Sequence, residues 1–184
     1  IGDVILTLPL AGLIKQQFPN CSISFIGQPY TQAVIERCQQ VDHFISKADF
    51  ITSHTNTKAD AIIHVFPDAA IAKAAKGKDI TLRIGTTNRW FHWLYCNRLV
   101  RLSRRHSPLH EAQLNAKLLQ PLFLETNYSL EQLADAATLR TETSSAFSLD
   151  HSKYHLILHP TSKGSAREWG NENFENLVRL LPKE

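Results

Sequence analysis

The stretch Ala61-Ile62-Ile63-His64-Val65-Phe66, closed by Pro67-Asp68, is the segment that decides the fold. It is apolar at nearly every position over the length of one strand, a pattern typical of a strand buried on both faces of a parallel sheet. The Ala-rich segment 69–76 that follows predicts a helix, and the segment 81–85 predicts another strand. Because strands and helices alternate, we expect an α/β fold with a parallel sheet and helices on both faces.

The same alternation extends along the rest of the chain. Apolar periodicity predicts a helix over 4–18, which Pro9 is expected to bend, and Asp3 stands where an N-cap belongs. Further strands are predicted at 22–26, 43–45 and 154–158, and further helices at 31–39, 111–122 and 171–181. His64, inside the buried strand, is expected to be a hydrogen-bonded core residue.

The segment 138–152 is rich in Ser and Thr, lacks periodicity and is typical of a linker. We therefore predict an N-terminal α/β domain over residues 1–137 and the beginning of a second α/β domain over 153–184. The chain starts at Ile1, contains no Met and stops soon after a helix-like segment. We expect a fragment of a longer protein, in which the first strand precedes Ile1.

Composition excludes several classes of protein. The chain is 43% hydrophobic and 20% charged, which is ordinary for a globular protein, and its net charge of +3 is too small to name a partner. No apolar run is long enough for a membrane span, and no signal peptide is evident. The three Cys and nine His match no metal-ligand spacing. We expect a cytoplasmic protein with reduced thiols and no metal site.

Gly2-Asp3 stands at the beginning of an apolar helix. If a strand precedes this helix, the dipeptide lies at the strand-to-helix turn, where open α/β sheets bind their ligands. Gly2 permits a tight turn close to a ligand, and the positive end of a helix favours an ionised Asp3. Such a carboxylate can accept a proton from a bound hydroxyl, as a general base does. An ordinary N-cap is the alternative, and the dipeptide alone leaves both open.

A second candidate site is the loop 159–169, His-Pro-Thr-Ser-Lys-Gly-Ser-Ala-Arg-Glu-Trp. Its hydroxyls, glycine and two cations between a predicted strand and helix suit an anionic ligand such as phosphate. The spacing is not that of a P-loop, and a solvated polar loop is the other interpretation.

The third candidate is basic and aromatic: Arg89-Trp90-Phe91-His92-Trp93 precedes Arg98, Arg101, Arg104 and Arg105. Arginine pairs with phosphate and carboxylate, and tryptophan is common at membrane interfaces, so the cluster favours an anionic glycolipid or a membrane surface. No RNA- or DNA-binding motif points to nucleic acid. The alternative is a charged, exposed face beside core aromatics.

Taken together, these segments resemble the ADP-heptose:lipopolysaccharide heptosyltransferases, glycosyltransferase family 9. The matches follow the family's order and span nearly the whole chain: Gly2-Asp3-Val4 through Leu8-Pro9, the strand before Gly27, Arg83-Ile84-Gly85, His110-Glu111, and His159-Pro160-Thr161-Ser162 running to Trp169 and Phe174.

The resemblance implies a GT-B fold, in which two Rossmann-like domains face each other across a cleft. It implies an inverting transfer without a metal or other cofactor, with the acceptor on the N-terminal domain and a nucleotide-sugar donor on the other. Asp3 falls on the family's proposed base, Thr161 and Ser162 fall near the donor phosphates, and Arg167 falls near the cation that neutralises the leaving diphosphate. The family commonly has Lys where this chain has Arg167, and this chain has one extra residue between Ser162 and Arg167. Lys163 is therefore a further candidate for the contact with the donor phosphates.

For the acceptor side, the resemblance implies the inner core of lipopolysaccharide, and we expect Gly2, Arg98, Arg101, Arg104 and Arg105 to contribute to its binding or to contact with the inner membrane. The family's later nucleotide-recognition segments are absent from the chain, so the chain alone is not expected to be active. One alternative is a non-catalytic module of the same fold that binds an anionic glycan or nucleotide. Another is a different Rossmann-type enzyme, although the chain lacks GxGxxG after a predicted strand.

Overall fold

The computed structural model describes residues 1–53, 58–104, 107–122, 125–141, 150, 152–162, 164 and 166–182. The chain divides into two compact units, Ile1–Thr141 and Glu142–Glu184. The division falls within the range 138–152.

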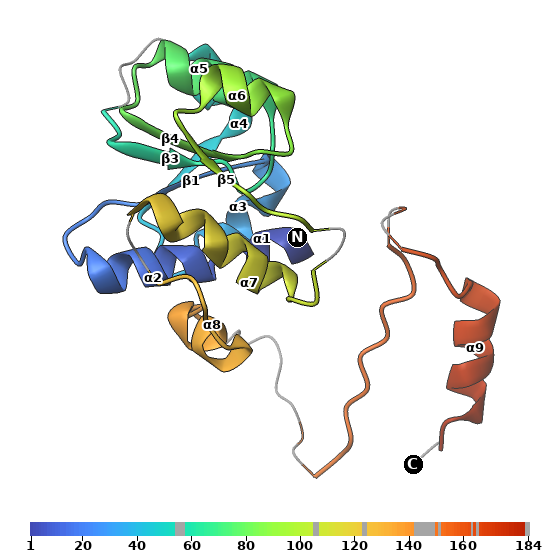
Figure 1. Cartoon of the computed structure of the whole chain (residues 1–184). Coiled ribbons are helices and arrows are strands. Elements are labelled where there is room, and N and C mark those ends of the chain that lie inside the picture. Colours follow the sequence, from blue (N-terminus) through green and yellow to red (C-terminus); the bar gives the residue numbers. More distant parts are fainter. Residues whose placement is uncertain are drawn as a thin grey trace. The chain divides into compact units, whose positions relative to one another are not determined.

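The described residues of the first unit form helices α1 to α8, the short helices η1 and η2, and strands β1 to β5 (Figure 1). The helices are α1 (Gly2–Ile5), α2 (Pro9–Gln17), η1 (Pro29–Thr31), α3 (Gln32–Ile35), α4 (Lys47–Thr52), α5 (Ala69–Gly77), α6 (Trp90–Tyr95), α7 (Glu111–Ala116), η2 (Lys117–Leu122) and α8 (Leu130–Ala136). The strands are β1 (Ser24–Gly27), β2 (His43–Ser46), β3 (Ala61–Ile63), β4 (Leu82–Thr86) and β5 (Arg98–Val100). The second unit contains α9 (Asn171–Leu180).

All strand pairs among the described residues are parallel, as predicted. β1 pairs with β2, and β4 lies between β3 and β5, with Ile63 opposite Ile84 and Ile84 opposite Arg98. In the described part of the chain, β1 and β3 are each paired on one side only. The predicted strand before Ile1 stays a prediction.

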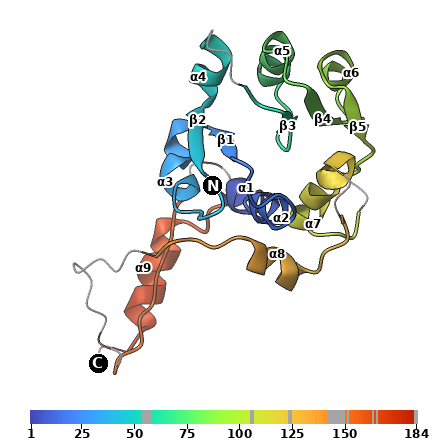
Figure 2. The same cartoon turned by 90° about the vertical axis from the view of Figure 1, so that its left-hand side faces the viewer.

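Helices cover both sides of the strands, which confirms the layered α/β prediction. Figure 2 shows α4, α5 and α6 on one side and α2 and α7 on the other. The larger core includes Leu13 of α2, Ile84 of β4 and Leu118 of η2, whereas Phe50, Ala75 and Ile80 form a smaller one under α4 and α5. None of the helices in the described ranges combines the length and apolar character that a membrane span requires.

The helix predicted over 4–18 is interrupted. α1 ends at Ile5, and Pro9 is the first residue of α2, where its missing N–H costs no helical hydrogen bond. The N-cap of α1 is Ile1, so the expectation that Asp3 is the cap is wrong: Asp3 lies in the first turn.

The prediction of a strand at 154–158 is also wrong, because these residues are irregular, and Ile157 is 90% exposed. A strand needs a neighbour to pair its backbone groups, and the described part of the second unit has none. The helix predicted at 171–181 is confirmed as α9.

Candidate active site

A cavity of about 200 Å³ lies at the carboxyl ends of three parallel strands, the edge where open α/β sheets bind ligands. Pro67 follows β3, Thr86 ends β4, and Ser103 and Arg104 follow β5. Asn88 and Arg89, from the turn before α6, complete the lining. Two hydroxyls, an amide and two guanidinium groups therefore surround a space that suits a polar, anionic ligand.

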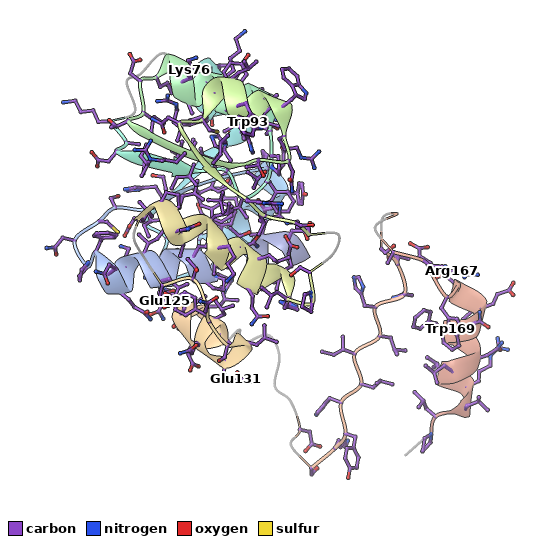
Figure 3. The ribbon with its side chains drawn as sticks, viewed as in Figure 1. Lys76, Trp93, Glu125, Glu131, Arg167 and Trp169 are labelled. Atoms are coloured by element: carbon purple, nitrogen blue, oxygen red, sulfur yellow. The ribbon has the colours of Figure 1, made fainter. Side chains whose placement is uncertain are left out.

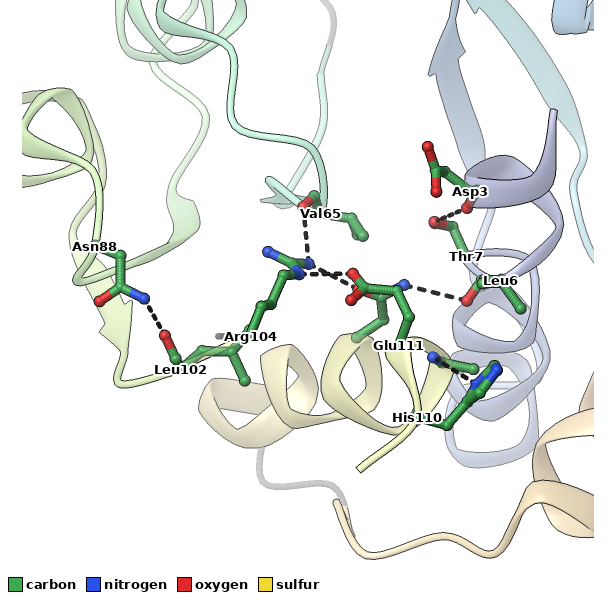
Figure 4. A network of polar contacts seen from close by, with 11 residues as sticks. Asp3, Leu6, Thr7, Val65, Asn88, Leu102, Arg104, His110 and Glu111 are labelled. Atoms are coloured by element: carbon green, nitrogen blue, oxygen red, sulfur yellow. Dashed lines mark hydrogen bonds and ion pairs between the residues drawn. The ribbon is translucent and has the colours of Figure 1, made fainter. Parts of the chain in front are cut away.

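Arg104 is held firmly at this edge (Figure 4). Its Nε donates to Glu111 Oε1 at 2.6 Å, and its Nη2 donates to Asn115 Oδ1 at 2.8 Å and to the Val65 carbonyl oxygen at 3.3 Å. These bonds join the segment after β5 to α7 and to the residues just past β3. A guanidinium fixed by three acceptors presents its charge in one orientation.

The same network reaches the helix that carries Asp3. Asn115 is 1% exposed, and its Nδ2 donates to the Leu6 carbonyl oxygen at 3.2 Å, directly after α1. Thr7 Oγ1 donates to the Asp3 carbonyl oxygen at 2.9 Å (Figure 4). Arg104 and Asn115 thus brace the turn between α1 and α2, and with it the backbone from which Asp3 projects.

The Asp3 carboxylate is exposed and has no ion pair or side-chain hydrogen bond with any described residue. A carboxylate without a partner among the described residues is available to a ligand. Gly2 beside it has no atom within 4 Å of the position that a Cβ would take, so a ligand has room to approach. This arrangement is compatible with a base, whereas the alternative role as a cap is not observed.

Two histidines lie beneath the cavity edge. His64 and His92 are 3% and 0% exposed, and their ring centroids are 5.5 Å apart. The Thr86 amide donates to His92 Nδ1 at 2.8 Å, so His92 positions a residue of the cavity lining. Burial is the main cause that lowers both pKa values, that of His64 to about 4. The rings are therefore neutral at pH 7 and act by packing.

Gly85 permits this packing, because a Cβ there would lie 2.7 Å from the His92 ring. The predicted burial of His64 is confirmed. The predicted hydrogen bond is not observed, because its Nε2, like that of His92, has no partner among the described residues.

The predicted arginines have different surroundings. Arg104 lines the cavity, Arg98 is exposed and donates to the Asn97 carbonyl oxygen at 3.0 Å, and Arg101 is exposed. Arg105 lies outside the described residues. The role of these side chains in acceptor binding stays a prediction. Sequence reasoning singled out Arg89 within the basic and aromatic cluster, but it did not assign Thr86, Asn88 and Ser103 to the site, although each follows or ends a strand, and that position was the available signal.

In the second unit, the loop before α9 is closed by its own side chains. Glu168 Oε1 accepts from the Ser162 amide at 2.8 Å and from its hydroxyl at 3.2 Å, and Ser162 Oγ also donates to the Ala166 carbonyl oxygen at 3.0 Å. Thr161 is exposed, as is Arg167, while Lys163 lies outside the described residues. Trp169 packs edge-on against Phe174 of α9.

The described residues contain no group of three His, Cys, Asp or Glu side chains that could hold a metal ion. A larger cavity of about 710 Å³, lined among others by Asp42, His43 and Arg140, lies at the opposite, amino ends of β1 and β2. We place the candidate site at the smaller cavity because the fixed cation and the Asp3 helix are tied to that edge.

No family model matches the chain. The chain is 24% identical to a Haemophilus influenzae protein named "Putative glycosyltransferase" over an alignment of 202 residues. This alignment covers 100% of the chain and 58% of the relative, so the chain spans a little over half of that protein's length.

A crystal structure of a glycosyl transferase family 9 protein from Veillonella parvula matches the chain with a TM-score of 0.56 and 22% identity. The match covers 67% of the chain and 38% of the other protein. This likeness shows that the chain has the α/β fold of that structure over two-thirds of its length.

Proposed function

We propose that the protein to which this chain belongs is an inverting glycosyltransferase, which moves a heptose or related sugar from an ADP-sugar to the inner core of lipopolysaccharide. The observation that carries the proposal is the Asp3 carboxylate, which has no side-chain partner among the described residues and projects from a backbone braced to an arginine that lines a ligand-sized cavity. The glycosyltransferase relative and the fold likeness point to the same reaction class.

In this mechanism, Asp3 accepts the proton of an acceptor hydroxyl as its oxygen attacks the anomeric carbon of the donor sugar. The new carbon–oxygen bond forms while the bond to the diphosphate breaks, and attack from the opposite face inverts the anomeric centre. Asp3 then holds the proton and the nucleoside diphosphate carries the negative charge away.

The cavity residues suit the acceptor side. Arg104 and Arg89 provide cations for the phosphates or carboxylates of a lipopolysaccharide core, and the hydroxyls of Thr86 and Ser103 suit sugar oxygens. The network through Glu111 and Asn115 holds the Arg104 guanidinium in place, so little side-chain freedom is lost when an anion binds.

The donor side belongs to the second unit in this proposal. Thr161, Ser162, Lys163 and Arg167 offer hydroxyls and cations to the diphosphate, whose charge grows as the bond breaks. Fixed donors and a cation lower the barrier where that charge develops, so this chemistry does not require a metal ion.

The test uses the complete protein with ADP-heptose and a truncated lipopolysaccharide acceptor. Asp3→Asn keeps the shape but removes the base, and we expect kcat to fall by about 10² to 10⁴, the usual contribution of a general base. Asp135→Asn, which changes another exposed carboxylate on α8, is the matched control and is expected to retain activity.

Undiminished transfer by Asp3→Asn would rule out Asp3 as the base. A complete protein that binds ADP or the acceptor but transfers no sugar would favour the alternative, a non-catalytic binding module.

A further inference from the structure

Helix α6 exposes large apolar side chains to solvent and buries a polar one, the reverse of an ordinary surface helix. Trp90, Trp93 and Leu94 are 72%, 63% and 54% exposed, whereas His92 is fully buried. Positions i, i+3 and i+4 lie on one side of a helix, so these three large apolar side chains share the solvent side. A surface helix normally turns its polar residues outward, and a clustered apolar face marks an interaction site.

The indole N–H groups of the two tryptophans on this face differ in their hydrogen bonds. Trp93 Nε1 donates to the Thr87 carbonyl oxygen at 3.0 Å, so the exposed part of that indole is hydrocarbon. Trp90 Nε1 has no hydrogen-bond partner among the described residues. One ring is therefore suited to an apolar layer, and the other retains a donor for an oxygen-rich layer.

Two cations lie at the two ends of this helix, in a segment of the chain that is rich in basic residues. Residues 69–104 contain eight Lys and Arg and one acid, Asp79. Lys76 of α5 donates to the Leu94 carbonyl oxygen at 3.0 Å and so holds a cation at the end of α6, while Arg89 is exposed at its start. Figure 3 shows Lys76 and Trp93 on the neighbouring helices α5 and α6.

We propose that this surface, the α6 face formed by Lys76, Arg89, Trp90, Trp93 and Leu94, docks on an anionic lipid bilayer. Tryptophans concentrate at the interface between headgroups and acyl chains, and basic residues beside them are attracted to anionic lipids. α6 has six residues, so it lies on the bilayer and does not cross it. The positive charge of Lys76 and Arg89 is complementary to an anionic lipid surface, whereas an apolar protein partner would leave these cations unpaired.

The α6 face also borders the candidate site. Arg89 lines the cavity and directly precedes Trp90, and Phe66, which is 56% exposed, directly precedes the lining residue Pro67. A docked protein would hold the cavity close to the headgroups, where a lipid-anchored acceptor presents its sugars. This last consequence rests on the proposed function, whereas docking itself does not.

The experiment measures co-sedimentation of the protein with vesicles of phosphatidylethanolamine and phosphatidylglycerol, and with vesicles of phosphatidylcholine alone. The docking variant is Trp90→Gln with Leu94→Gln, because neither side chain makes an internal hydrogen bond. Tyr30→Gln with Leu130→Gln is the matched control, since these residues are 70% and 47% exposed on other helices. We expect the docking variant to bind anionic vesicles about tenfold more weakly, and the control to bind like the wild type.

A spectroscopic measurement locates the contact. Trp169→Phe leaves Trp90 and Trp93 as the two remaining tryptophans of the chain's three. On addition of anionic vesicles, we expect their emission to shift to the blue and to be quenched by lipids brominated in the acyl chains. Folding of every variant is checked by circular dichroism and by its unfolding midpoint.

Equal vesicle binding by the folded docking variant and the wild type would overturn the proposal. The proposal would also be overturned if the wild type bound no vesicles but self-associated, and if the docking variant lost this self-association. That result would make the α6 face a protein interface. Transfer to an acceptor freed of its lipid is expected to be unchanged in the docking variant. Failure of transfer with intact vesicle binding would instead count against the proposed function alone.

Discussion

Two imidazole rings, those of His64 and His92, lie in the interior of the first unit, and the Nε2 of each has no partner among the described residues. A buried polar atom without a hydrogen bond is costly, and a buried charge without a partner is costlier. Both rings are therefore held in the neutral form, and the fold is sensitive to any condition that protonates histidine.

Acidification is expected to destabilise the first unit through His64. Its pKa falls from 6.5 to about 4 on folding, mainly because burial penalises the charged form. Between these values the unfolded chain binds a proton that the folded chain does not. The free energy of unfolding is thus fully retained above pH 6.5 and falls as the pH drops towards 4, by up to about 3 kcal/mol.

Urea unfolding at a series of pH values checks this prediction. His64→Leu should make the dependence on pH shallower over that window, whereas Thr31→Val, a change at another buried polar residue, should shift stability equally at every pH. Equal slopes in wild type and His64→Leu would show that His64 does not carry the effect.

Helix α2 meets α8 so closely that one position between them must lack a side chain. A Cβ on Gly12 would lie 1.6 Å from the Ala136 carbonyl oxygen, which is backbone and cannot rotate away. Gly12→Ala should therefore separate the two helices and lower the free energy of unfolding by at least about 2 kcal/mol.

Gly77→Ala is the matched control, because nothing lies within 4 Å of the position that a Cβ would take there, at the end of α5. It should leave stability unchanged or raise it by about 0.5 to 1 kcal/mol, since alanine favours a helix. Thermal unfolding of both variants measures the difference, and a Gly12→Ala protein as stable as the wild type would contradict the close packing.

Local sequence patterns predicted the presence of helices and strands better than the residues at which they end. Asp68 caps α5 by accepting from the amides of Ala70 and Ile71, so the helix begins where the sequence places it. β3 ends at Ile63 although the apolar run continues to Phe66, because Val65 turns back to bond with the Ile63 carbonyl oxygen. Hydrophobicity reports burial, and it does not report where a strand loses its partner.

The helix predicted over 111–122 shows the same limit from another cause. It is regular as α7 to Ala116 and then tightens into η2, which contains Pro121. A proline inside a helix removes one backbone donor, so the apolar spacing survives while the α-helical hydrogen bonds do not.

At the scale of the whole molecule, the candidate site combines residues that one sequence cannot bring together by spacing. Val65 and Arg104 meet because the parallel strands β3 and β5 place their carboxyl ends at a common edge, and Asn115 of α7 links them there to Leu6 after α1. Sequence reasoning singled out Asp3 and Arg104 by residue type and position. It singled out Arg89 only as part of a basic cluster and could not find Pro67, Thr86, Asn88 and Ser103, because the cavity lining depends on the order of the strands, which is set by tertiary pairing.

The two units are expected to divide the substrates between them. In the complete protein, Arg167→Gln should raise the KM for the nucleotide-sugar donor by about tenfold, the loss of one charge-assisted contact to a phosphate, and leave the acceptor KM unchanged. Arg89→Gln at the cavity should do the reverse, since its exposed side chain lines the cavity that we propose as the acceptor site.

Arg179→Gln is the control for charge alone, because Arg179 is exposed on α9 and its ion pair with Glu175 is long, at 3.9 Å, and also exposed. Initial rates with each substrate varied in turn separate the two KM values, and the direct binding of ADP separates affinity from turnover. A donor effect from Arg89→Gln equal to that from Arg167→Gln would show that the units do not divide the substrates. An undisturbed acceptor KM in Arg89→Gln would move the acceptor away from the cavity at the ends of β3, β4 and β5.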